Sequence, residues 1–107
     1  MAKYRSVQDK LFDAIFIQDI QSVKFCVENR AEINVKGSKV KTFPLHSAVC
    51  SGNLAIIKIL LQNGAEVNIK NHAGISPLHV AARTGRLDLV KLLVQHGAQI
   101  DVKDEKS

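Results

Sequence analysis

Residues 74–98 read GISPLHVAARTGRLDLVKLLVQHGA, and this stretch predicts two short helices joined by a tight turn. Ser76 can cap the first helix, and Pro77 suits its first turn because no backbone N–H is needed there. The second helix, at about 87–95, carries a wide apolar face that another element must cover. Gly97 then supplies the left-handed backbone that ends it. Neither helix is long enough to be stable alone, so such units must stack on one another.

The same pattern occurs one unit earlier in the chain. Pro44–His46 returns as Pro77–His79, 33 residues later and in the same order. Residues 38–70 align with residues 71–103 without a gap, and 12 of the 33 positions are identical, which is far beyond chance. A fixed period of this length is the signature of a repeat protein.

A more divergent copy precedes these two. Asn29–Lys36 matches Asn63–Lys70 at a shift of 34 residues. The additional residue falls within 37–41, and an insertion at that place belongs in a loop. The chain therefore contains three similar units.

Residues 74–98 resemble the ankyrin repeat consensus almost position for position, and the second unit resembles it nearly as well. The first unit resembles an N-terminal capping repeat, and together the three cover residues ~6–104. The resemblance implies an all-α repeat protein, an ankyrin solenoid of antiparallel helix pairs joined by β-hairpin-like loops.

We therefore expect one ankyrin-repeat domain over residues 1–107. It divides into repeat 1 at about 6–37, repeat 2 at 38–70, repeat 3 at 71–103 and the start of a fourth repeat at 104–107. The helix pairs are expected at 7–17 with 20–29, 45–51 with 54–62, and 78–84 with 87–95, in an L-shaped stack with loops at 35–43 and 68–76.

Repeat 3 has no polar replacement on its apolar face, unlike a terminal capping unit. We expect either that the chain is a fragment with further repeats or that it covers this end by association, including self-association.

Three residues depart from the family pattern. Phe43 stands where a helix-capping threonine is usual, and losing such a cap costs about 1 kcal/mol. Arg30 replaces the glycine that ends a second helix, and Gln18 replaces the glycine between two helices. A non-glycine residue in the left-handed conformation costs roughly 1–2 kcal/mol. We expect strain at these sites and an unchanged fold.

Composition and charge fit a folded protein. Apolar residues make up 46% of the chain and charged residues 23%, which is too apolar for disorder. No apolar run approaches the ~20 residues of a membrane helix, and the N-terminus lacks the apolar core of a signal peptide. The formal net charge of +5 favours acidic partners, and an excess of solvated lysine is the alternative explanation.

The chemistry of an enzyme is missing from the sequence. It contains no GxSxG, no HExxH and no glycine-rich phosphate loop, so we assign no catalytic residue, no cofactor and no metal. His46 and His79 end equivalent Pro-Leu-His steps, and the resemblance implies that each bonds from its helix to a neighbouring loop. His72 is expected at a hairpin tip and His96 near a helix end, both in contact with solvent.

The two cysteines have neither CxxC spacing nor a disulfide framework, and we expect reduced thiols in the cytoplasm, with the nucleus left open. Cys26 replaces an apolar core residue and is expected to be a buried, inert thiol. Cys50 aligns with Arg83 on the exposed side of a first helix. It either contacts a partner, is modified, or is a tolerated small residue.

In the ankyrin family the positions that vary with the partner are the hairpin tips and the exposed end of each first helix. The resemblance places there Phe16, Ile17, Lys39, Val40, Thr42, Cys50, Ser51, His72, Ala73, Ile75, Arg83 and Thr84. Similar capping repeats usually carry small or polar residues where this chain has Phe16 and Ile17. These two side chains either meet a partner or pack beneath the first hairpin.

Lysines gather on or beside the expected hairpin tips: Lys36, Lys39, Lys41, Lys70 and Lys103. They form either a rim for an acidic partner or a solvated edge.

Asn68 resembles the asparagine that asparaginyl hydroxylases modify in other ankyrin repeats, and Asn34 is a weaker candidate. The alternative is that each asparagine bonds the backbone of its own turn.

The sequence thus predicts a non-enzymatic protein-interaction module that binds another protein through its concave helix face and hairpin tips, with no membrane contact. Two alternatives stay open: a targeting arm of a larger enzyme or adaptor, and a basic nucleic-acid binder that rests on net charge alone.

Overall fold

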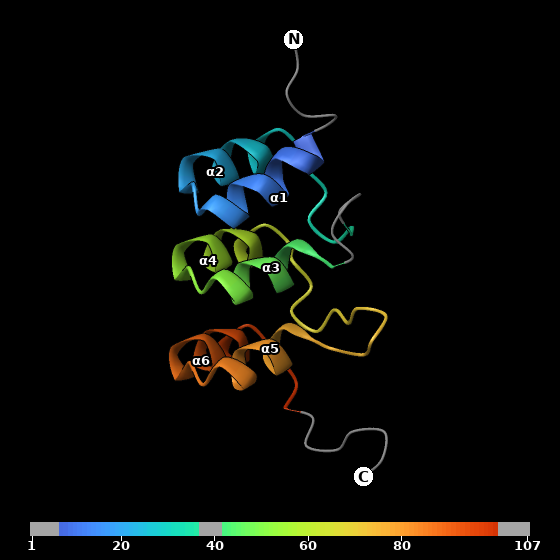
Figure 1. Cartoon of the computed structure of the whole chain (residues 1–107), viewed down its shortest axis with the longest axis vertical. Coiled ribbons are helices and arrows are strands. Elements are labelled where there is room, and N and C mark those ends of the chain that lie inside the picture. Colours follow the sequence, from blue (N-terminus) through green and yellow to red (C-terminus); the bar gives the residue numbers. More distant parts are fainter. Residues whose placement is uncertain (1–6, 37–41, 101–107) are drawn as a thin grey trace.

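The computed structural model describes residues 7–36 and 42–100, and this part of the chain contains six helices and no strand. The helices form three pairs, namely α1 (Val7–Ile17) with α2 (Ile20–Glu28), α3 (Pro44–Ser51) with α4 (Leu54–Gln62), and α5 (Pro77–Thr84) with α6 (Leu87–Gln95). The pairs lie one above another, with α1, α3 and α5 in one column and α2, α4 and α6 in a second (Figure 1).

The expected helix bounds are confirmed to within one residue. Helix α2 ends at Glu28 and not at 29, while α3 and α5 begin on Pro44 and Pro77, one residue earlier than expected. The earlier starts follow from proline, whose fixed φ and missing N–H are accommodated in a first helical turn.

The loop before α5 has the expected hairpin-like turn. The Asn71 N–H donates to the Ile75 carbonyl at 3.1 Å, and the Gly74 N–H donates to the Asn71 carbonyl at 2.9 Å. The Asn71 side-chain oxygen also accepts from the Ala73 and Ile75 N–H groups. Part of the other expected loop, 37–41, lies outside the described residues, as do residues 101–107.

The core runs through the whole stack between the two helix columns. Leu45, Ile57, Leu60 and Leu93 are fully or almost fully buried in it. Cys26 is buried there too, as expected, and burial raises the pKa of its thiol. Each pair contributes one side of a shared core, because a single pair has too little apolar surface to fold alone.

The helix starts differ between repeats in the way the sequence predicted. The Ser76 hydroxyl accepts from the His79 N–H, and the His79 Nδ1 accepts from the Ser76 N–H in return, which makes a capping box at α5. Phe43 gives α3 no side-chain cap.

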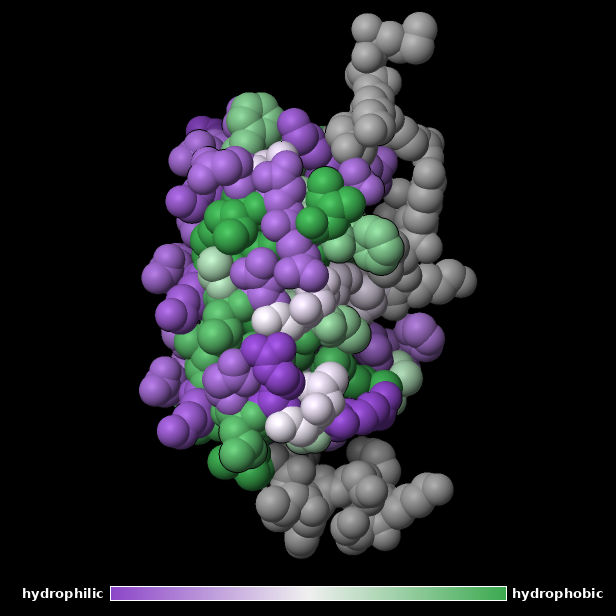
Figure 2. Space-filling view, turned by 60° about the vertical axis from the view of Figure 1, so that its left-hand side comes forward, coloured by the Kyte–Doolittle hydropathy of each residue, from purple (hydrophilic) through white to green (hydrophobic). Residues whose placement is uncertain are grey.

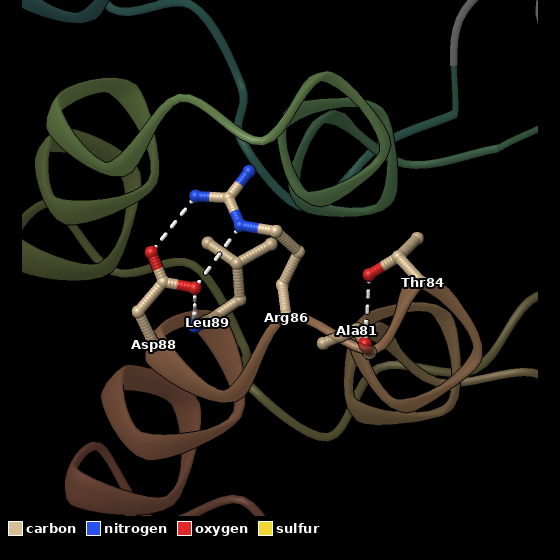
Figure 3. Close-up of polar contacts among 5 residues, drawn as sticks. All are labelled: Ala81, Thr84, Arg86, Asp88 and Leu89. Carbon is tan, nitrogen blue, oxygen red and sulfur yellow. Dashed lines mark hydrogen bonds and ion pairs between the residues drawn. The ribbon is translucent and has the colours of Figure 1, made fainter.

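Helix α6 begins without the side-chain cap that Asn53 gives α4. Arg86 stands at that position, and its guanidinium donates twice to the Asp88 carboxylate, at 2.8 and 3.1 Å (Figure 3). Arg86 also reaches toward the preceding repeat, where its Nη1 would lie 2.6 Å from a Cβ placed on Gly52. The turn between α3 and α4 therefore has room for glycine alone in this arrangement.

Left-handed backbone occurs at the two sites where the sequence departs from glycine. Gln18 has φ +60° and Arg30 has φ +68°, whereas the equivalent positions of repeat 2 are Gly52 at +76° and Gly64 at +99°. The substitutions did not change the geometry of the turns, so their strain is stored in repeat 1.

Side-chain amides link the loops of successive repeats. Asn34 donates to the Gly64 carbonyl at 2.9 Å and accepts from the Glu66 N–H at 2.8 Å. Asn68 repeats this arrangement one unit later, on the backbone of Gly97 and Gln99. The expectation that each asparagine bonds its own turn is wrong, because each one holds the turn of the next repeat.

Candidate functional site

A groove of about 650 Å³ runs along the first-helix column and takes lining residues from all three helix pairs. Its size is typical of sites that hold several ligand side chains. It is lined by Phe12, Phe16, Thr42, His46, Ser47, Cys50, Ser51, Asn71, Ile75, Val80, Arg83 and Thr84.

Most of the residues that the sequence predicted for partner contact meet in this groove. They are Phe16, Thr42, Cys50, Ser51, Ile75, Arg83 and Thr84. Ile17, His72 and Ala73 are exposed but do not line it. Lys39 and Val40 lie outside the described residues.

Sequence reasoning missed Phe12, His46, Ser47, Asn71 and Val80 as lining residues. For four of them a signal existed, because each lies four residues before a predicted residue, one helical turn away on the same face. The fifth, Asn71, opens the hairpin and needed the folded loop to be placed.

Phe16 and Ile17 are open to solvent at the end of α1. Phe16 is 81% exposed and Ile17 is 60% exposed. The alternative that both pack beneath the first hairpin is therefore wrong. Large apolar side chains at such exposure are common binding anchors when they border a groove.

Internal hydrogen bonds already occupy much of the polar chemistry of the groove. The Thr84 hydroxyl donates to the Ala81 carbonyl of its own helix at 2.8 Å (Figure 3). The Asn71 oxygen accepts from the hairpin backbone. Arg83 is the one side chain with a formal charge among the described lining residues, and none of them is acidic.

His46 makes the helix-to-loop bond that the family resemblance implied. Its Nε2–H donates to the Ile75 carbonyl at 2.7 Å, while its buried Nδ1 has no partner among the described residues. In repeat 3 the Nδ1 of His79 is satisfied by Ser76, whose place in repeat 2 is taken by Phe43. The missing cap therefore also leaves the buried ring nitrogen unbonded.

This arrangement predicts a loss of stability in mild acid. Burial lowers the pKa of His46 below 6.5, against the opposing effect of the bond to Ile75. Between the lowered pKa and pH 6.5 the unfolded chain binds the proton and the folded chain does not, so stability is fully present above pH 6.5 and falls as the pH decreases below it.

Urea unfolding at about pH 7.5 and about pH 5.5 measures this slope, which the H46Q variant should flatten. The H72Q variant, at an exposed hairpin position, should keep the slope of the native protein. An H46Q variant with an undiminished slope would assign the acid sensitivity to another group.

The stack ends in an apolar surface on α6. Leu87 is 75% exposed and Ile100 is 67% exposed. Their equivalents in repeat 2, Leu54 and Val67, pack against the core that repeat 3 completes. Figure 2 turns the second-helix column forward and shows apolar surface at its lower end, beside the residues in grey.

A family model for ankyrin repeats in three copies matches residues 11–104. The chain belongs to the ankyrin repeat family. Among curated proteins, none matches it as a relative. Ankyrin repeats are in general protein–protein interaction modules, and the family is typically non-enzymatic.

Other predicted features stand as follows in this ankyrin-repeat chain. The described residues hold no group of His, Cys, Asp or Glu suited to a metal ion. Within the same part of the chain, no helix has the length and apolar character needed to cross a bilayer. Cys50 is exposed and Cys26 is buried, each as a free thiol. Lys36 and Lys70 are exposed, while Lys39, Lys41 and Lys103 lie outside the described residues. Hydroxylation of Asn68 stays a prediction.

Proposed function

We propose that this ankyrin-repeat chain binds a partner protein through the groove along α1, α3 and α5 and the hairpin tips beside it. The observation that carries the proposal is the assembly of Phe16, Cys50 and Arg83 in one groove. These residues occupy the equivalent helix-end position in the three repeats, so the stack brings together sites that are 33 or 34 residues apart in the chain.

Phe16 supplies the test. Replacing it with serine should weaken partner binding about tenfold or more, because an exposed aromatic anchor typically contributes over ~1 kcal/mol to an interface. The partner is first isolated with the native chain, and the dissociation constants of the native and F16S chains are then measured by calorimetry.

F25S is the matched control, since Phe25 is also an exposed phenylalanine on a helix but does not line the groove. It should bind the partner as the native chain does. If F16S instead keeps its affinity and loses thermal stability, Phe16 has a structural role and the proposal is wrong.

The apolar end at Leu87 and Ile100 supports a second contact, with a further repeat or another copy of the chain. Sedimentation at rising protein concentration tests for self-association. A chain that stays monomeric would leave only further repeats or a different partner for this surface.

The alternatives proposed from the sequence are a targeting arm of a larger protein and a nucleic-acid binder. Binding along a phosphate backbone needs several cations, and the described lining of the groove supplies Arg83 alone, so we favour a protein partner. A cytoplasmic location agrees with the two free thiols and is part of the proposal.

A further inference from the structure

We infer that the groove binds an extended peptide segment with an apolar side chain at one end and a carboxylate about six residues away. The inference rests on the proposed function and specifies the chemistry of the partner.

The apolar end of the groove lies on α1. Phe12 is largely buried and forms part of the wall, while Phe16 stands 81% exposed one turn further along the same helix. Burying such a ring against an aliphatic or aromatic side chain removes apolar surface from water on both partners. An apolar residue of the ligand is the group that gains most from this end.

The opposite end of the groove carries the charge. Arg83 lies near the end of α5, and the described ion pairs do not include it. The lining residues include no carboxylate that would repel an acidic ligand. A guanidinium without a partner offers a fork of donors that suits a carboxylate, and the net charge of +5 attracts an acidic segment from a distance.

The spacing follows from the stacking of the repeats. Phe16, Cys50 and Arg83 occupy equivalent positions, and α1 contacts α3 as α3 contacts α5. Neighbouring helices pack roughly 8–10 Å apart, so the two ends are separated by roughly 16–20 Å. An extended chain covers this distance in about five or six residues at ~3.3 Å each.

The volume favours an extended segment over a helix. A helix with side chains is roughly 10–12 Å wide and would fill about 1,600 Å³ or more over the same length. The groove offers about 650 Å³. A single extended chain therefore matches it better.

Cys50 provides a position-specific reporter. It lies in the groove between the two ends and is exposed, whereas Cys26 is buried. A ligand that spans from Phe16 to Arg83 must cover Cys50 and slow its reaction with iodoacetamide. Mass spectrometry of the alkylated chain measures that rate without any label in the groove.

The probes are fluorescein-labelled peptides in which one leucine and one glutamate are separated by a varied number of Gly/Ser residues, with the order of the two also reversed. Anisotropy should show the tightest binding at a separation of about five or six residues, in one of the two orders, together with protection of Cys50. The R83E variant should lose about tenfold in affinity for the glutamate peptide and recover it with a lysine peptide. K91E, which reverses a charge on α6 outside the groove, is the matched control.

Affinity that does not depend on the spacing, or that is the same in R83E, would overturn the inference. The proposed function has a separate outcome: a native partner that binds the chain through Phe16 but not through Arg83 would leave the groove as an interface and reject only the acidic peptide. Loss of neither interaction in F16S and R83E would reject both.

Discussion

The L60A variant should lose about 2–5 kcal/mol of its free energy of unfolding, because the substitution leaves a cavity in a closely packed core. Leu60 is fully buried in α4, the second helix of the middle repeat. A repeat stack gains stability from each interface between neighbours, and the middle repeat takes part in both interfaces of the described stack. Urea unfolding followed by far-ultraviolet circular dichroism measures the loss.

L87A is the matched control. Leu87 also lies on a second helix, but it is 75% exposed at the end of the stack. Its removal should cost under ~0.5 kcal/mol in a dilute monomer. A loss as large as that of L60A would show that Leu87 is covered in solution, and a loss that grows with protein concentration would identify a second copy as the cover.

Returning glycine to the two strained turns should stabilise the protein. Gln18 and Arg30 hold left-handed backbone, and relieving each site gains roughly 1–2 kcal/mol. Glycine makes the unfolded chain more flexible and takes back ~0.4–1 kcal/mol per site. The Q18G/R30G double variant should therefore gain about 1–2 kcal/mol, which calorimetry would detect as a melting temperature higher by several degrees.

The control for this prediction places glycine in regular helix. Gln62 is exposed in the last turn of α4, and the Q62G variant should lose roughly 0.5–1 kcal/mol. Opposite signs for the two kinds of site would show that the gain comes from the backbone conformation. A loss in Q18G/R30G would mean that side-chain contacts of Gln18, such as the one with Asn53 at 3.3 Å, contribute more than the strain costs.

Local chemistry was sufficient to predict the helices. Each one is bounded by residues whose effect acts within one turn, such as the Ser76 cap and the left-handed Gly85 that follows α5. The three-unit period then fixed the stacking, because short amphipathic helices have no other way to bury their apolar faces. The same alignment correctly predicted that Cys26 is buried and that Gln18 and Arg30 are strained.

Contacts between repeats were beyond the sequence. The Asn34 and Asn68 side chains bond to the following repeat, and no local rule distinguishes this from a bond within their own turn. His46 lacks a partner for its Nδ1 because of a substitution three residues earlier, which matters only once the ring is buried.

The sequence alone determined the fold, the family and the helix ends that face a partner, because periodicity and capping are local properties that one chain displays directly. Only the tertiary structure decided that Phe16 is exposed and that it shares a groove with Cys50 and Arg83. Those residues come from three different repeats, and their distance in space is set by how the helices pack, a quantity that no residue of the sequence carries by itself.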